Sequence, residues 1–296
     1  MNDEPFVPEV GPWAEEKLKC LGKYLSAYTT ILRKYNFKGY VYIDAFAGTG
    51  TAKIRKKTAD DVEGAFFTDL LQKPTDDGQE EFIEGSPRVA LGLQHPFTTY
   101  VFVEMSGKRR KELEKLKKEH SGSDIRIRDR DCNEYLLELL NKDVNWKEWR
   151  GVVFLDPFGA HVPWETVSAL GRTGSFEVFI NFPWMAISRL ANNDGNIPKG
   201  HRMILDRYFG SEEWFDVMYR HEHSLFGDAI HAKEQNAAKA LVNWYREKLK
   251  STFGYASRAR LIKNTKNSPL YYLIWAGPKS TGQGIADDIL SQGEVI

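Results

Sequence analysis

The chain has 296 residues, and its 41 Lys and Arg residues balance 41 Asp and Glu residues, so the formal net charge is zero. This balance excludes a protein that is basic all over, but it leaves room for a local basic face. The two cysteines, Cys20 and Cys132, are too few for a disulfide scaffold or a cysteine-rich zinc site. No apolar run predicts a membrane helix or a signal peptide, so we expect a cytoplasmic protein with a large core.

The expected elements begin with a helix over residues 11–37, where Leu18, Leu21 and Leu25 recur at spacings of three and four. The period then changes to short β-branched and aromatic runs. These predict five strands, at 40–45, 99–104, 125–128, 152–156 and 176–182. Helical patterns separate them, at 87–94, 107–120, 133–140 and 164–170. Strands that alternate with helices predict a parallel α/β sheet.

Three further segments complete the expected architecture. Residues 55–84 form a long, polar connection, which at this length is either functional or mobile. Residues 185–250 are mostly helical in pattern and predict an insertion. Residues 258–263 and 270–275 predict two strands joined by a short connection, hence an antiparallel C-terminal hairpin. We expect one domain over 1–296, with a seven-stranded, mostly parallel sheet.

The first predicted strand ends in an acid and a turn of small residues, which let the backbone pass close to a ligand. Its members are Asp44, Ala45, Phe46, Ala47, Gly48, Thr49 and Gly50. The turn lacks the third glycine of a dinucleotide fingerprint and the Gly-Lys-Ser/Thr of a phosphate loop. A ligand with a neutral or cationic part near Asp44 therefore fits better than a pyrophosphate, and S-adenosylmethionine (SAM) is such a ligand. The alternative is a tight turn with a solvated Asp44.

An acid also ends the second predicted strand, and another follows the third. Glu104, followed by Met105, could accept both hydroxyls of a ribose, or it could cap the next turn. Asp131, followed by Cys132, could hold an adenine amino group, a role for which Asp129 competes, or it could be a helix N-cap. With the glycine turn, these residues make up the predicted SAM site.

The fourth predicted strand ends in Asp156, Pro157 and Phe158, which we predict to be the catalytic residues. Because proline has no N–H group, the turn leaves carbonyl oxygens free to accept. Asp156 and such a carbonyl could accept both protons of an exocyclic amine, while Phe158 stacks on a flat base. Catalysis would then be mostly orientation of the amine toward a methyl donor. The alternative is a strand-end turn with a buried Phe158.

A basic run lies just beyond the glycine turn and predicts contact with nucleic acid, since phosphate binding needs such clusters. It comprises Lys53, Arg55, Lys56 and Lys57. A charge run is also compatible with a solvated face. Trp13 and Lys17, one helical turn apart, could fold over the SAM site, or Trp13 could belong to the core. No metal site is expected.

These motifs resemble those of class I SAM-dependent methyltransferases. Asp-Ala-Phe-Ala-Gly-Thr-Gly at 44–50 resembles their SAM-binding first motif. Asp-Pro-Phe-Gly at 156–159 resembles the Asp-Pro-Pro-Tyr/Phe motif of enzymes that methylate amino groups of adenine or cytosine, although it has a single proline. The resemblance implies a Rossmann-like fold and SAM as cofactor.

Over residues 11–290 the chain resembles the bacterial three-Cys-motif partner family. The resemblance is carried by GPWAEEKL at 11–18, YIDAFAGTG at 42–50, GSPRVAL at 85–91, VFVE at 101–104, FLDPFG at 154–159, VPWETV at 162–167, Phe182-Pro183 and LYYLIWAGP at 270–278. It implies a neighbouring partner protein with a three-cysteine motif, of an iron–sulfur or radical-SAM-like kind.

Three functions are compatible with these features. The first is transfer of a methyl group from SAM to an exocyclic amine of a nucleic-acid base, and it is the one that the strand-end acids favour. The second is a SAM-binding interaction module for the three-cysteine-motif protein. The third is a methyltransferase that acts on a small molecule or a protein.

Overall fold

A computed structural model of the chain describes residues 6–54, 82–223 and 229–296. Most of the predicted connection at 55–84, including Arg55, Lys56 and Lys57, lies outside these residues. None of the described helices combines the length and the apolar character that crossing a membrane requires.

The centre of the fold is an eight-stranded sheet with the order β11-β13-β8-β7-β2-β5-β6, in which β12 also pairs with β13. Its strands are β2 (Gly39–Asp44), β5 (Thr99–Val103), β6 (Ile125–Arg128), β7 (Trp149–Leu155), β8 (Phe176–Phe182), β11 (Tyr255–Ala256), β12 (Arg260–Lys263) and β13 (Pro269–Gly277). The first five are parallel, and β13 runs antiparallel to β8 and to β12. The expected Rossmann-like α/β class, with its C-terminal hairpin, is confirmed. The sequence predicts seven strands, whereas the sheet has eight. The additional strand, β11, has only two residues, which are too few to show a period.

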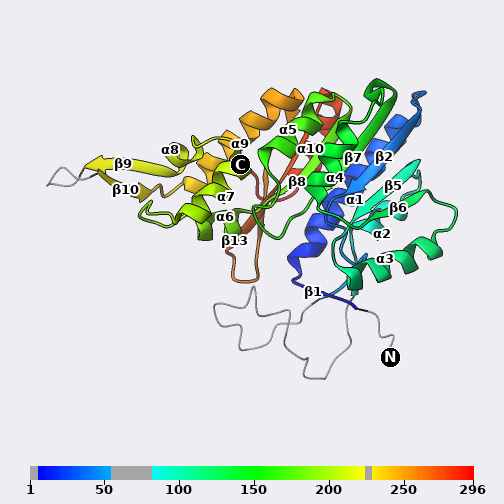
Figure 1. Cartoon of the computed structure of the whole chain (residues 1–296), viewed down its shortest axis with the longest axis horizontal. Helices are drawn as coiled ribbons and strands as arrows, with labels where there is room; N and C mark the ends of the chain where they lie inside the picture. Colours follow the sequence, from blue (N-terminus) through cyan, green and yellow to red (C-terminus); the bar gives the residue numbers. More distant parts are fainter. Residues whose placement is uncertain (1–5, 55–81, 224–228) are drawn as a thin grey trace, which may run out of the picture.

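Helices cover both faces of this sheet (Figure 1). They are α1 (Trp13–Leu32), α2 (Ser86–Leu91), α3 (Gly107–Glu119), α4 (Cys132–Leu140), α5 (Trp164–Arg172), α6 (Trp184–Leu190), α7 (Lys199–Phe209), α8 (Trp214–Met218), α9 (Ala237–Phe253) and α10 (Ser280–Leu290), with a 3-10 turn, η1 (Trp146–Glu148). Successive strand residues point to opposite faces. Tyr42 therefore packs with α1, α2, α3 and α10, whereas Ile43 packs with α4, α5 and α9.

The segment 185–250 contains α6, α7, α8 and most of α9, and it also contains two strands that the sequence pattern did not predict. Between α8 and α9 it contains an antiparallel ribbon of β9 (Tyr219–His223) and β10 (Ala229–Lys233). Figure 1 shows this ribbon, in yellow, extending away from the central sheet. Its two strands pair with each other and not with the central sheet. They therefore show little of the apolar pattern that identifies a core strand.

A second small sheet borders the glycine turn. It has the order β1-β3-β4 and consists of β1 (Glu9–Val10), β3 (Thr51–Ile54) and β4 (Phe82–Glu84). The Gly85 N–H donates to the Gly50 carbonyl at 2.9 Å, which fixes the turn against the start of α2. Segments from three parts of the chain therefore frame the residues that follow β2.

Candidate functional site

The five parallel strands have the spatial order 3-2-1-4-5 when numbered along the chain, so the order reverses between β2 and β7. Open α/β sheets bind ligands at such a switch point, outside the carboxyl ends of the strands. Four strands carry a polar residue at or next to this end: Asp44, Glu104, Asp156 and Asn181. We call these four residues the carboxyl-end site.

The glycine turn adopts the conformation that its sequence predicts. Gly48 has a φ of +64°, in the left-handed region that side chains other than glycine rarely adopt. Its N–H group donates to Glu104 Oε2 at 3.0 Å. A Cβ atom placed on Gly48 would meet no atom within 4 Å, so the turn borders open space rather than a packed wall. A ligand can therefore approach the backbone here.

Asp44 is completely buried, which rules out the alternative of a solvated strand-end acid. The Tyr42 hydroxyl donates to its Oδ2 at 3.2 Å, and the Phe46 N–H donates to Oδ1 at 3.3 Å. Burial, together with the charge of Asp156, raises the pKa of Asp44 to about 7, although hydrogen bonds to the carboxylate, foremost the one from Ser86, lower it in part. A carboxyl group that titrates near neutral pH is typical of functional sites.

Glu104 joins the glycine turn to the start of α3. Its Oε1 accepts from the Ser106 N–H at 2.8 Å and its Oε2 from the Gly48 N–H. Arg109 Nη1 lies 3.7 Å from Oε2. The alternative of a capping role is therefore realised. Each carboxylate oxygen can accept more than one hydrogen bond, so Glu104 could also accept from ribose hydroxyls. Binding of a ribose stays a prediction.

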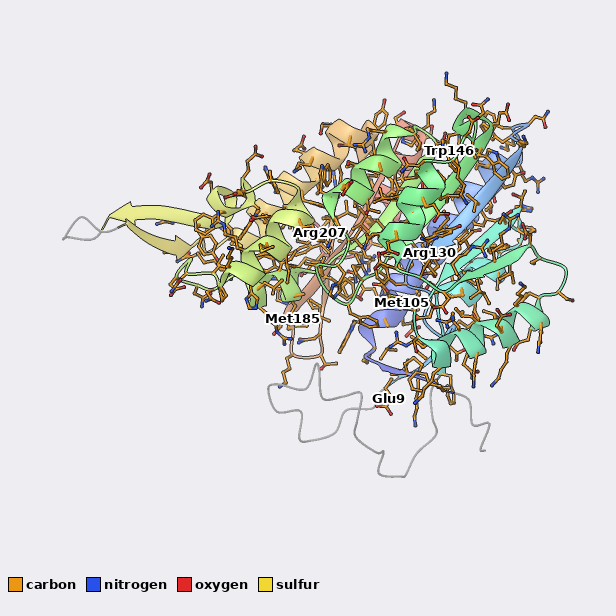
Figure 2. The ribbon with its side chains drawn as sticks, viewed as in Figure 1. Glu9, Met105, Arg130, Trp146, Met185 and Arg207 are labelled. Atoms are coloured by element: carbon orange, nitrogen blue, oxygen red, sulfur yellow. The ribbon has the colours of Figure 1, made fainter. Side chains whose placement is uncertain are left out.

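Two apolar side chains beside Glu104 are exposed. Met105 is 65% exposed and Phe158 is 73% exposed, so the alternative of a buried Phe158 is wrong. The Arg109 guanidinium carbon lies 5.6 Å from the centre of the Phe158 ring, which places that ring on the Glu104 side of the site. Figure 2 shows Met105 at this edge of the sheet. An exposed aromatic face here can stack on a flat base.

Asp131 and Cys132 begin α4. Asp131 Oδ1 accepts from the N–H groups of Asn133 at 2.9 Å and Glu134 at 3.2 Å, so the N-cap alternative is realised. Cys132 is buried, and burial raises the pKa of its thiol to about 12. The thiol therefore stays protonated at neutral pH. Contact of either residue with adenine stays a prediction.

Asp156 is held from two sides by residues that are distant in sequence. Lys17 Nζ of α1 lies 2.5 Å from Asp156 Oδ2, and Asn181 Nδ2 donates to Asp156 Oδ1 at 2.7 Å. The Lys17 side chain is 12% exposed and that of Asp156 is 21% exposed, so water screens this ion pair only in part. Trp13 packs against the core, which is the alternative that the sequence left open, whereas Lys17 lies in contact with the carboxyl-end site.

Asn181, at the end of β8, was not predicted from the sequence. Since Asp156 accepts from its Nδ2 atom, its Oδ1 atom must point away from the carboxylate. That oxygen is buried and has no hydrogen-bond partner among the described residues. A signal was present, because Asn181-Phe182-Pro183-Trp184 ends a strand with a polar residue, a proline and aromatic residues, as Asp156-Pro157-Phe158 does.

Of the predicted nucleic-acid-binding residues, the structure describes Lys53. It lies in β3, where it pairs with Glu9 of β1 and Phe82 of β4. Arg55, Lys56 and Lys57 lie outside the described residues, so the basic run stays a prediction.

No protein-family model matches the sequence. No curated protein matches it either. The structure resembles protein LPL1258 from Legionella pneumophila, with a TM-score of 0.52 and 14% identity over 92% of this chain and 89% of that one. This likeness shows a shared fold. The membership of the three-Cys-motif partner family that the motifs suggest is not established.

Two weaker likenesses are to structures whose descriptions mention SAM or its demethylated product. A SAM-dependent methyltransferase from Clostridium acetobutylicum has a TM-score of 0.31 and 12% identity over 86% of this chain and 91% of that one. The N-terminal domain of EvdMO1, solved with S-adenosylhomocysteine (SAH) bound, has a TM-score of 0.32 and 9% identity over 86% and 81%. Scores this low carry no argument about activity, which has to come from the carboxyl-end site.

Proposed function

We propose that this protein is a SAM-dependent methyltransferase. The observation that carries the proposal is the switch point between β2 and β7, where the Gly48 amide is bonded to Glu104 and a buried Asp44 lies close by. SAM presents an ammonium group and two ribose hydroxyls, for which Asp44 and Glu104 offer carboxylate oxygens. A dinucleotide would instead need a phosphate-binding helix start directly after the turn, and β3 follows it here.

The residues present fit this cofactor. The open space beside Gly48 admits a ligand to the backbone, and the exposed side chain of Met105 offers apolar surface for an adenine ring. Asp44 would hold the amino-acid part, Glu104 the ribose, and Asp131 or Asp129 the adenine amino group. SAM, when bound, supplies an activated methyl group.

The proposed acceptor is an exocyclic amine of a nucleic-acid base, adenine being the best example. Asp156 and a backbone carbonyl of the turn that it begins with Pro157 and Phe158 would accept the two N–H groups of such an amine, and the exposed Phe158 ring would stack on the base. The ammonium group of Lys17 now lies against Asp156 and would give way to the amine. Asp156 would orient the amine nitrogen toward the methyl group that bound SAM supplies, and the proton that the amine loses on methylation would pass to Asp156 or to water. The protein contributes mainly orientation.

The proposal is tested by two measurements on the same variants. Calorimetric titration should show micromolar binding of SAM and SAH, weakened at least about tenfold in Glu104→Ala and unchanged in Asp288→Asn, an exposed acid on α10. Transfer of a labelled methyl group to DNA and RNA oligonucleotides should fall about a hundredfold or more in Asp156→Asn, with SAM affinity kept. Full transfer by Asp156→Asn would contradict the catalytic assignment, and no binding of SAM or SAH would contradict the function.

A second candidate function is an interaction module for a three-cysteine-motif protein. It is favoured by the fact that both oxygens of Asp156 already accept from residues of this chain, Lys17 and Asn181. Under this proposal the native chain and Asp156→Asn would associate equally with the partner, and neither would transfer a methyl group. Gel filtration of the two proteins mixed at micromolar concentration distinguishes the candidates.

A further inference from the structure

A cavity lies at the opposite end of the sheet from the carboxyl-end site. It has a volume of about 390 Å³ and opens between the second half of α1 and the start of α10. Phe37 before β2, Arg150 at the start of β7 and Glu177 at the start of β8 form its floor. Because these strands are parallel, their amino ends lie far from Asp44 and Asp156. Trp146, which Figure 2 labels, lies beside this end of the sheet.

The walls of the cavity are mainly aromatic and aliphatic. Tyr24, Tyr28 and Tyr35 come from α1 and the turn after it, and Ile285 comes from α10. The Arg150 guanidinium carbon lies 4.3 Å from the centre of the Phe37 ring, so the guanidinium group stacks on this ring. A flat ligand is the shape that such walls accommodate.

Two buried polar groups in these walls have unused hydrogen-bonding capacity. The Tyr28 side chain is 6% exposed, and its hydroxyl has no partner among the described residues. Glu177 is 8% exposed and accepts from the Tyr24 hydroxyl and, at 3.4 Å, from Trp275 Nε1, with both bonds on Oε2. Its Oε1 atom can accept from a further donor.

A buried hydroxyl without a partner costs free energy, so such groups in native proteins usually bond to water or to a ligand. One water occupies about 30 Å³, far less than this cavity, and the walls are mostly apolar. A mostly apolar cavity of this volume with a few polar groups is typical of a small-molecule site.

We propose that the amino-end cavity binds a planar nitrogen heterocycle of nucleobase size that carries an N–H or NH₂ donor. The ring would lie against the aromatic walls, the donor would bond to Glu177 Oε1, and a ring nitrogen would accept from the Tyr28 hydroxyl. This site is separate from the carboxyl-end site, and the inference does not depend on the proposed methyltransferase function.

The test uses the full chain and the fluorescent base 2-aminopurine, whose emission is quenched when it stacks on aromatic rings. At pH 8, above the pKa of about 7 to which burial raises Glu177, we expect saturable quenching with a dissociation constant below about 1 mM. Adenine should compete, whereas benzoate, which is flat but has no N–H donor, should not. Absence of saturable quenching would overturn the proposal.

Variants locate the bound base. Tyr28→Phe and Glu177→Gln should each weaken 2-aminopurine at least about tenfold. Tyr255→Phe, which lies outside the cavity in β11, and Asp156→Asn should leave its affinity within about twofold. Loss of binding in Asp156→Asn, or displacement of the base by SAH, would place it at the carboxyl-end site and overturn the proposal. If Glu177→Gln does not fold, Tyr28→Phe decides alone, since it removes a hydroxyl without a described partner and should keep the native melting temperature.

Discussion

At the scale of single residues, the ion pair of Lys17 and Asp156 is the contact that most shapes the carboxyl-end site. Its two atoms lie 2.5 Å apart, and both side chains are less than a quarter exposed. Removal of one partner leaves a poorly hydrated charge, so it costs more than removal of both. The pair therefore links the stability of the chain to the same carboxylate that the proposed reaction uses.

We expect Lys17→Met and Asp156→Asn each to lower the free energy of unfolding by about 2 kcal/mol. The double variant should lose less than the sum of the two, because the second change removes the group that the first left unpaired. Urea denaturation of the four proteins measures this coupling. Losses that simply add would show that water screens the pair.

At the scale of elements, the end of α7 depends on a close approach to α5. Gly210 follows α7 with a φ of +72°, and a Cβ atom placed on it would lie 2.5 Å from Cδ1 of Trp164, the first residue of α5. Gly174, which follows α5, has a similar φ of +63° but open space around it. The two glycines thus share the backbone constraint and differ in packing.

This pair gives a matched prediction. Gly174→Ala should cost about 1 kcal/mol of unfolding free energy, since only the left-handed backbone is strained. Gly210→Ala should cost about 3 kcal/mol, because α7 must also move away from Trp164. Thermal or urea unfolding of both variants measures the difference, and equal losses would show that Trp164 moves aside freely.

At the scale of the whole molecule, the sheet carries a buried acid near each end. Burial raises the pKa of Asp44 from 3.8 to about 7 and that of Glu177 from 4.5 to about 7. Between about pH 4 and pH 7 the folded chain therefore binds more protons than the unfolded chain. The stability that these two acids contribute is therefore fully present below about pH 4. It is lost as the pH rises through about 7.

We expect the free energy of unfolding to fall between pH 5 and pH 8 by on the order of 3 kcal/mol for each acid. Glu177→Gln, which cannot ionise, should show a smaller fall than the native chain. Asp288→Asn, an exposed acid on α10, serves as the control and should keep the native pH profile. Identical pH profiles for the native chain and Glu177→Gln would show that Glu177 does not change its protonation in this range.

The sequence by itself determined the central strands, the helices between them and the acids at the strand ends. These are local properties, because periodicity, glycine turns and strand ends are encoded within a few neighbouring residues. The predicted runs at 40–45 and 176–182 correspond to β2 and β8 for this reason. The β9–β10 ribbon was missed because its pairing does not require a buried apolar face.

Only the tertiary structure decided which side chains meet. It placed Lys17 against Asp156 across 139 positions of the chain, and Tyr24 against Glu177 across 153. It also left Asn181 Oδ1 and the Tyr28 hydroxyl buried without partners among the described residues. Such meetings depend on how helices of both halves of the chain pack on the sheet, and no local pattern records that packing. The contacts around Asp156 in the carboxyl-end site and the whole of the amino-end cavity arise in this way.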